Sequence, residues 1–95
     1  MSKPRRISST TEPDQRYERW EVGHHDVAFI AQQAGIRSPG GDSLTTILVV
    51  AVNAVVVHRS RHATLGEAGA KIEAMRHEVL ERLRKADELA FGPIA

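Results

Sequence analysis

The sequence has no cysteine and few aromatic residues. Its 95 residues include one tryptophan, one tyrosine and two phenylalanines. Without cysteine the chain can form neither a disulfide nor a thiolate metal site, so nothing argues for an oxidising compartment. Because aromatic side chains supply much of the buried area in small cores, aliphatic residues must fill this one. A chain of this length is marginally stable alone, which favours extra burial against a partner or a second copy.

A strong charge of one sign and a secretory leader are also lacking. The formal net charge is +1, so no strong overall field attracts nucleic acid or acidic lipid. No apolar leader segment follows Met1, and we expect a cytoplasmic protein. The sequence also lacks a glycine-rich phosphate loop and a recognisable nucleophile motif. These absences predict neither a cofactor nor an enzyme.

Residues 1–15 are predicted to form a flexible basic arm. They contain two prolines, a Ser/Thr run and the cations Lys3, Arg5 and Arg6. Such a segment holds too little apolar surface to offset the entropy lost on ordering. A basic arm can contact a partner subunit or a phosphate backbone, so nucleic acid is a candidate partner. The remaining residues, 16–95, are expected to form a single small helical domain.

Residues 26–34 are predicted to form a short helix, which Asp26 caps and Gly35 ends. The sequence FIAQQAGI in this region resembles the first helix and turn of a helix-turn-helix, which implies a DNA-binding regulator. The strongest loop signal, SPGGDS at residues 38–43, follows it. The next stretch presents valines where a recognition helix needs polar side chains, which disfavours that alternative.

The apolar stretch Leu44–Val57 carries conflicting signals. Nine of its fourteen residues are β-branched, which favours a strand. The stretch is long for a strand, however, and Asn53-Ala54 is an unfavourable hairpin turn because alanine resists positive φ. We therefore predict a buried helix over residues 43–58, in which Asn53 makes a buried hydrogen bond that sets the register of packed helices. An α+β fold with this stretch as strands is the alternative.

The same stretch offers a membrane alternative. Fourteen helical residues would span about 21 Å, which is less than the ~30 Å hydrocarbon core, and Thr45, Thr46 and Asn53 are polar. The basic sequence HRSRH that follows is nevertheless typical of a stop-transfer segment. A buried helix is favoured, and a membrane-attached protein anchored by residues 44–57 is an alternative.

Residues 65–90 form the clearest predicted helix. Thr64 and Glu67 match a capping box, and an apolar stripe runs along one face. The stripe and the alternating charges beside it are typical of an antiparallel helix pair or a short coiled coil. The sequence therefore predicts an all-α fold in which the buried helix 43–58 packs on a long amphipathic C-terminal helix.

The histidines form the one constellation that could carry chemistry. The order Gly-His-His, Asn, His-x-x-x-His resembles the His-Asn-His nucleases of the ββα-metal type. The resemblance implies that His24, His58 and His62 bind a metal ion. It also implies that His25 is the general base and that Asn53 orients it. The valines around Asn53 depart from that family, and we favour the histidines as polar residues at helix ends, with no bound metal.

The predicted function is that of a non-enzymatic structural, adaptor or regulatory subunit. Every face of the central stretch is apolar, so a single two-helix contact cannot cover it. We therefore predict a homo-oligomer or a subunit of a larger protein assembly. The alternatives are a membrane-attached protein, a metal-dependent nuclease and a DNA-binding regulator. The predicted interface residues are Ile47, Val50, Val52, Asn53, Val56, Leu65, Ile72, Met75, Val79 and Leu83.

Overall fold

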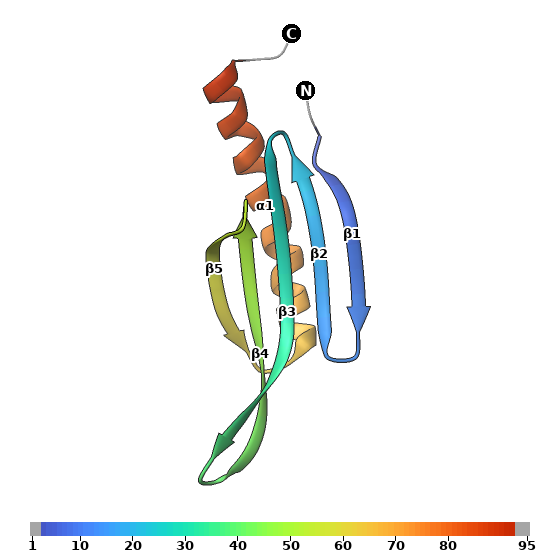
Figure 1. Ribbon diagram of the computed structural model, residues 1–95, viewed down its shortest axis with the longest axis vertical. Coiled ribbons are helices and arrows are strands. Elements are labelled where there is room, and N and C mark those ends of the chain that lie inside the picture. The colour runs from blue at the N-terminus through green and yellow to red at the C-terminus, as the bar shows by residue number, and fades with distance from the viewer. Residues whose placement is uncertain (1–2, 93–95) are drawn as a thin grey trace.

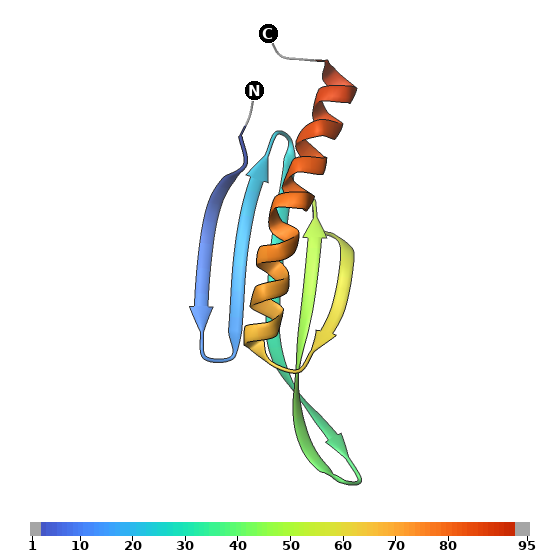
Figure 2. The same ribbon diagram turned by 180° about the vertical axis from the view of Figure 1, so that it is seen from behind.

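An antiparallel sheet and a helix form two layers (Figure 1). The computed structural model describes residues 3–92. The strands pair in sequence order, so each is joined to its neighbour by a hairpin. Helix α1 crosses one face of the sheet, as Figure 2 shows from behind. The elements are β1 (Arg5–Glu12), β2 (Gln15–Val22), β3 (His25–Ser38), β4 (Gly41–Val52), β5 (Val55–His62) and α1 (Leu65–Phe91).

The all-α prediction is wrong, and the fold is α+β. The predicted helix 26–34 lies within β3, and the predicted helix 43–58 is divided between β4 and β5. The coiled-coil prediction is also wrong, because α1 packs on the sheet instead of on another helix. The strands follow from the β-branched residues of the central stretch, whose side chains fit a pleated surface better than a helix. The α+β alternative agrees with the structure.

Asn53 and Ala54 form the two-residue turn that the sequence argued against. Both adopt positive φ, 50° and 67°, between the paired residues Val52 and Val55. Asparagine tolerates this conformation, whereas alanine pays a steric cost of about 1 kcal/mol. The expectation is wrong because the free energy gained by pairing β4 with β5 exceeds the steric cost of one strained residue.

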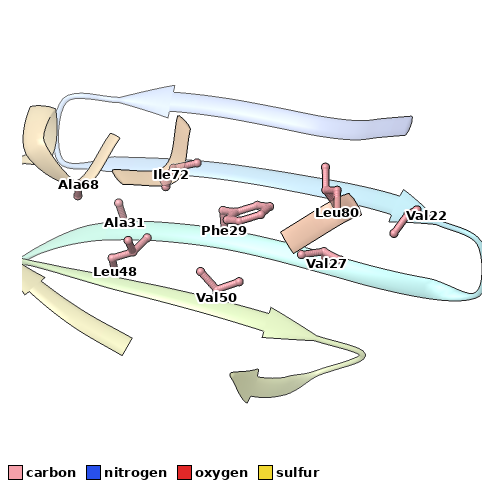
Figure 3. Close-up of a cluster of buried hydrophobic side chains, with 9 residues drawn as sticks. All are labelled: Val22, Val27, Phe29, Ala31, Leu48, Val50, Ala68, Ile72 and Leu80. Carbon is pink, nitrogen blue, oxygen red and sulfur yellow. The ribbon is translucent and has the colours of Figure 1, made fainter. Parts of the chain in front are cut away.

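The core lies between the sheet and α1 (Figure 3). Alternate residues of the central strands point toward the helix, as the two-residue period of a strand requires. The helix contributes residues spaced by four and eight positions. The fully or almost fully buried apolar residues are Val22, Val27, Phe29, Ala31, Leu48, Val50, Ala68, Ile72 and Leu80.

A buried ion pair joins the sheet to the helix. The side chain of Glu18 on β2 is only 2% exposed. Arg76 of α1 donates to both of its carboxylate oxygens, from Nε to Oε1 at 2.8 Å and from Nη2 to Oε2 at 2.6 Å. Trp20 Nε1 also donates to Oε1 at 3.0 Å, and the Arg76 guanidinium lies 5.6 Å from the Trp20 ring centroid. The buried carboxylate is therefore fully hydrogen-bonded, as burial of a charge requires.

Residues 5–12, predicted as part of a flexible arm, form the edge strand β1. They pair antiparallel with β2, from Arg5 opposite Glu21 to Glu12 opposite Gln15. Residues 1 and 2 of the predicted arm lie outside the described part of the chain. All of its side chains are exposed, which agrees with the mainly polar composition of the segment. Pairing with β2 supplies the backbone hydrogen bonds that its side chains cannot replace.

Glu18→Gln is expected to lower the unfolding free energy at pH 7 by on the order of 3 kcal/mol, because Arg76 then faces a neutral partner. Burial alone would raise the pKa of the Glu18 carboxyl, but hydrogen bonds from Arg76 and Trp20 outweigh it and hold the pKa below its ordinary value. A depressed folded-state pKa stabilises above the unfolded pKa, and this contribution is lost as the pH falls through the folded value. The deficit of the variant should therefore shrink in denaturant titrations at acidic pH.

The matched control is Glu78→Gln, which breaks an exposed pair with Arg82. It should cost less than about 0.5 kcal/mol at either pH. An equal deficit for Glu18→Gln at neutral and strongly acidic pH would contradict the assignment of the acid-sensitive stability to Glu18.

Ala54→Gly is expected to raise the unfolding free energy by about 1 kcal/mol, because glycine adopts φ 67° without a Cβ clash. The control Ala51→Gly lies within β4 and should instead lower it by roughly 0.5–1 kcal/mol. Thermal melts of the two variants give the comparison. A decrease for both would show that the turn stores no strain.

Candidate functional site

The two residues that the nuclease alternative implies as a catalytic pair lie side by side at one end of the sheet. Asn53 is in the β4–β5 turn and His25 begins β3. The Asn53 side-chain nitrogen lies 3.3 Å from His25 Nδ1. On its other side, His25 Nε2 lies 2.9 Å from Asp87 Oδ1 of α1. The Asn53 side-chain oxygen accepts from the Asp26 backbone N–H at 2.9 Å.

These contacts occupy both nitrogens of the His25 ring. In the neutral ring with a proton on Nε2, that N–H donates to Asp87 and Nδ1 accepts from Asn53. Neither nitrogen is then free to accept a proton from a water molecule, as a general base must. The geometry instead ties two turns of the sheet to the C-terminal part of α1.

Gly23 allows Asp87 to approach the β2–β3 turn. Gly23 has φ +58°, and a Cβ atom placed there would lie 1.8 Å from Asp87 Oδ2. The same carboxylate oxygen accepts from the His24 backbone N–H at 3.4 Å. A substitution at Gly23 would therefore displace Asp87 as well as strain the turn.

The three histidines that the nuclease alternative implies as metal ligands are not arranged as a metal site. His58 and His62 lie on β5, where their Nε2 atoms are 3.0 Å and 2.8 Å from the Ser60 hydroxyl. His24 lies in the β2–β3 turn. Among residues 3–92, no group of three or more histidine, aspartate or glutamate side chains is arranged to hold a metal ion. The structure thus places His25 beside Asn53 without the metal centre that the nuclease resemblance implies.

Of the basic residues near the N-terminus, Arg5 and Arg6 lie in β1 and Lys3 precedes it. Arg5 makes an exposed ion pair with Glu21 at 3.3 Å. Arg6 lies directly opposite Trp20, and Lys3 is exposed just before the strand. The Glu21 carboxylate reduces the charge that this segment would present to a phosphate backbone.

Most residues predicted for an interface instead pack inside the protein. Val50 and Ile72 are fully buried in the core. Five more pack against that core from α1 and β4, namely Val52, Leu65, Met75, Val79 and Leu83. Ile47, Asn53 and Val56 lie outside it, and Val56 is 58% exposed. The apolar stripe of α1 is therefore used for the protein's own fold.

The face of the sheet opposite α1, here called the open face, carries an apolar row. Tyr17, Ile30 and Val49 lie directly opposite one another on β2, β3 and β4. Each alternates with residues that point toward the helix, so these side chains point away from it. The ion pair between Arg19 and Asp26, at 2.7 Å, lies beside this row on the same face. The open face thus has an apolar centre with charged flanks.

The β3–β4 hairpin extends beyond the rest of the sheet (Figure 1). Pairing with β2 ends at Gln32, and pairing with β5 ends at Thr46. Residues 34–44, here called the projecting hairpin, therefore form a two-stranded ribbon. The molecule is 60 Å long and only about 20 Å wide in its other dimensions, 21 and 20 Å. Leu44, near the base of this ribbon, is 68% exposed.

Sequence reasoning missed both the projecting hairpin and the open face. The sequence predicts that the loop at residues 38–43 links two helices, whereas in the structure this segment forms the tip of a hairpin. The signal that could have found the hairpin is its position between two segments rich in β-branched and small residues. The length of the hairpin beyond the sheet depends on where β2 begins and where β5 ends, and no local pattern in the sequence predicts these positions.

Searches of protein-family models, curated proteins and solved structures gave no match to this chain. Within the described residues, no helix combines the length and the apolar character needed to cross a membrane. The stretch 44–57, considered as a helical anchor, consists of strand residues and the β4–β5 turn.

His25→Ala is expected to lower the unfolding free energy by about 1–2 kcal/mol, because Asp87 and Asn53 lose their shared partner. The control is His77→Ala on the exposed face of α1, which should change it by less than about 0.5 kcal/mol. Denaturant titration measures both. Equal unfolding free energies for the two variants would show that the contacts of His25 with Asp87 and Asn53 do not stabilise the fold.

Proposed function

We propose that this chain is a non-enzymatic structural subunit that assembles with copies of itself. The observation that carries the proposal is the projecting hairpin, residues 34–44, which extends past both flanking strands and past the helix layer. A protein that acted as a monomer would have no evident use for an element that its own fold leaves uncovered.

The physical argument concerns the stability of the hairpin. A two-stranded ribbon is marginally stable in water, because it buries little apolar surface and leaves both outer edges unpaired. Thr45, at its base, is 8% exposed, whereas Leu44, the next residue outward, is 68% exposed. Burial therefore ends abruptly where the hairpin leaves the sheet. Docking on a neighbouring molecule would cover the exposed apolar surface of the hairpin and could add a strand along one of its outer edges.

The open face supports a second copy as the neighbour. Its row of Tyr17, Ile30 and Val49 is an apolar surface that α1 does not cover. An antiparallel sheet can leave one face in water, but that face is then usually polar. The apolar centre of the open face matches the exposed apolar residue of the hairpin, and the same chain supplies both.

Shortening the hairpin tests the proposal. Replacing residues 35–44 with Asn-Gly joins the paired residues Ala34 and Thr45 through a two-residue turn and leaves the core intact. Light scattering behind size exclusion should give the wild type a mass that is a multiple of 10.5 kDa, and the shortened variant a smaller multiple at the same concentration.

Two controls make the result specific. Val49→Arg places a charge in the apolar row of the open face and should also lower the mass, whereas Lys85→Ala on the exposed side of α1 should not. Circular dichroism should show that Val49→Arg and Lys85→Ala keep the secondary structure of the wild type, and that the shortened variant loses only the strand signal of the residues removed. A wild type of 10.5 kDa at every concentration would refute self-assembly.

A further inference from the structure

We propose that β1 pairs with β1 of a second copy, antiparallel and about a two-fold axis at Ser9, so that two five-stranded sheets become one. The inference rests on the proposed function, because it specifies one contact of the self-assembly. It concerns a different surface from the projecting hairpin, so it can be tested separately.

The edge of β1 is available for pairing along its whole length. All eight residues, Arg5–Glu12, are exposed. In an edge strand, alternate backbone N–H and C=O groups point away from the sheet and have no strand to pair with. Pro4 and Pro13 flank the strand and cannot donate a backbone hydrogen bond, which confines any added ladder to residues 5–12.

A bulge determines which side chains of β1 share a face. Arg6 lies opposite Trp20 and Ser8 lies opposite Arg19, so Ile7 is an extra residue in β1. Residues separated by seven positions in a regular strand point to opposite faces. The bulge shifts this alternation by one position. Arg5 and Glu12 therefore both point to the open face.

This shift makes the strand complementary to itself. With Ser9 opposite Ser9 of the second copy, Ser8 lies opposite Thr10 of that copy. Because the bulged residue Ile7 has no partner of its own, Arg5 then lies opposite Glu12. The two-fold axis repeats each pair, so the interface would contain two Arg–Glu pairs at its ends and hydroxyl pairs between them. Cross-strand pairs of both kinds stabilise antiparallel ladders.

The other edge of the sheet does not fit a second copy in the same way. Strand β5, VVVHRSRH, carries Arg59 and Arg61 and contains no acidic residue. Antiparallel self-pairing through its basic half would place cations opposite cations, which opposes association. Charge complementarity therefore selects β1.

The proposed pairing also determines where α1, the open face and the projecting hairpin of each copy lie. A two-fold axis perpendicular to the sheet keeps both α1 helices on one face and both open faces on the other. The two projecting hairpins then point in opposite directions along the strands. The paired unit can thus reach further copies at both ends while its open faces form one continuous surface.

Charge reversal tests the pairing in the full chain. R5E places glutamate opposite Glu12, and E12R places arginine opposite Arg5, so each variant alone should dissociate about tenfold more readily than the wild type in sedimentation velocity. A mixture of R5E and E12R restores both attractive pairs and should associate as tightly as the wild type. The double variant R5E/E12R should also recover most of the association, because its pairs between the two copies are reversed but complementary, although each chain loses the Arg5–Glu21 pair.

A cross-linking experiment tests the register. The chain has no cysteine, so S9C and T11C each carry a single thiol on the same face of β1. In the proposed register the two S9C thiols meet at the axis, whereas the two T11C thiols are separated by about 13 Å or more along the strands. Mild oxidation should give a disulfide-linked dimer of S9C and not of T11C.

The outcomes separate this inference from the proposed function. If the wild type is monomeric at every concentration, both fail. If the wild type assembles but R5E, E12R and their mixture all associate as tightly as it does, the β1 contact is wrong and self-assembly stands. Equal cross-linking of S9C and T11C would also overturn the register.

Discussion

The buried contact between Glu18 and Arg76 determines how the two layers fit together. A carboxylate in the core is tolerable only when donors surround it, and here Arg76 comes from the helix while Trp20 comes from the same strand. Arg16 adds a further contact to Glu18 at 3.3 Å and lies against Gly69 of α1, where a Cβ atom would be 2.5 Å from its guanidinium. The chain thus fixes α1 over β2 and β3 with polar contacts of defined geometry and fills the remaining space with aliphatic side chains.

A single helix cannot cover a sheet of this width. It packs on β2, β3 and β4, and it reaches β5 through His58 and its neighbours. It does not cover β1, the open face or the projecting hairpin. These three surfaces differ in chemistry, since β1 is polar, the open face is apolar at its centre and the hairpin is an exposed ribbon. In the proposed assembly, each of these surfaces would contact a second copy.

Local patterns in the sequence predicted the helix well and the sheet poorly. Thr64 caps α1 by accepting from the Glu67 N–H, and the helix begins at Leu65 as expected. Glu67 in turn accepts from the Ala63 N–H and not from Thr64, a small departure from the predicted capping box. The helix prediction for the central stretch is wrong because the β-branched content of this stretch is a stronger signal than its length. The turn at Ala54 forms because the surrounding ladder enforces it. The partner of His25 could not have been found, since Asp87 lies 62 residues away and only the packed fold brings it near.

Hydrogen–deuterium exchange at low and high protein concentration distinguishes self-assembly through β1 and the projecting hairpin from a monomeric protein. Assembly should slow the exchange of backbone amides in residues 8–11 and 34–44 as concentration rises. Amides at the centre of the sheet, in residues 27–31 and 47–51, already pair within one molecule and should exchange at the same rate throughout. Exchange rates in β1 and in the hairpin that do not depend on concentration would contradict self-assembly through these two surfaces.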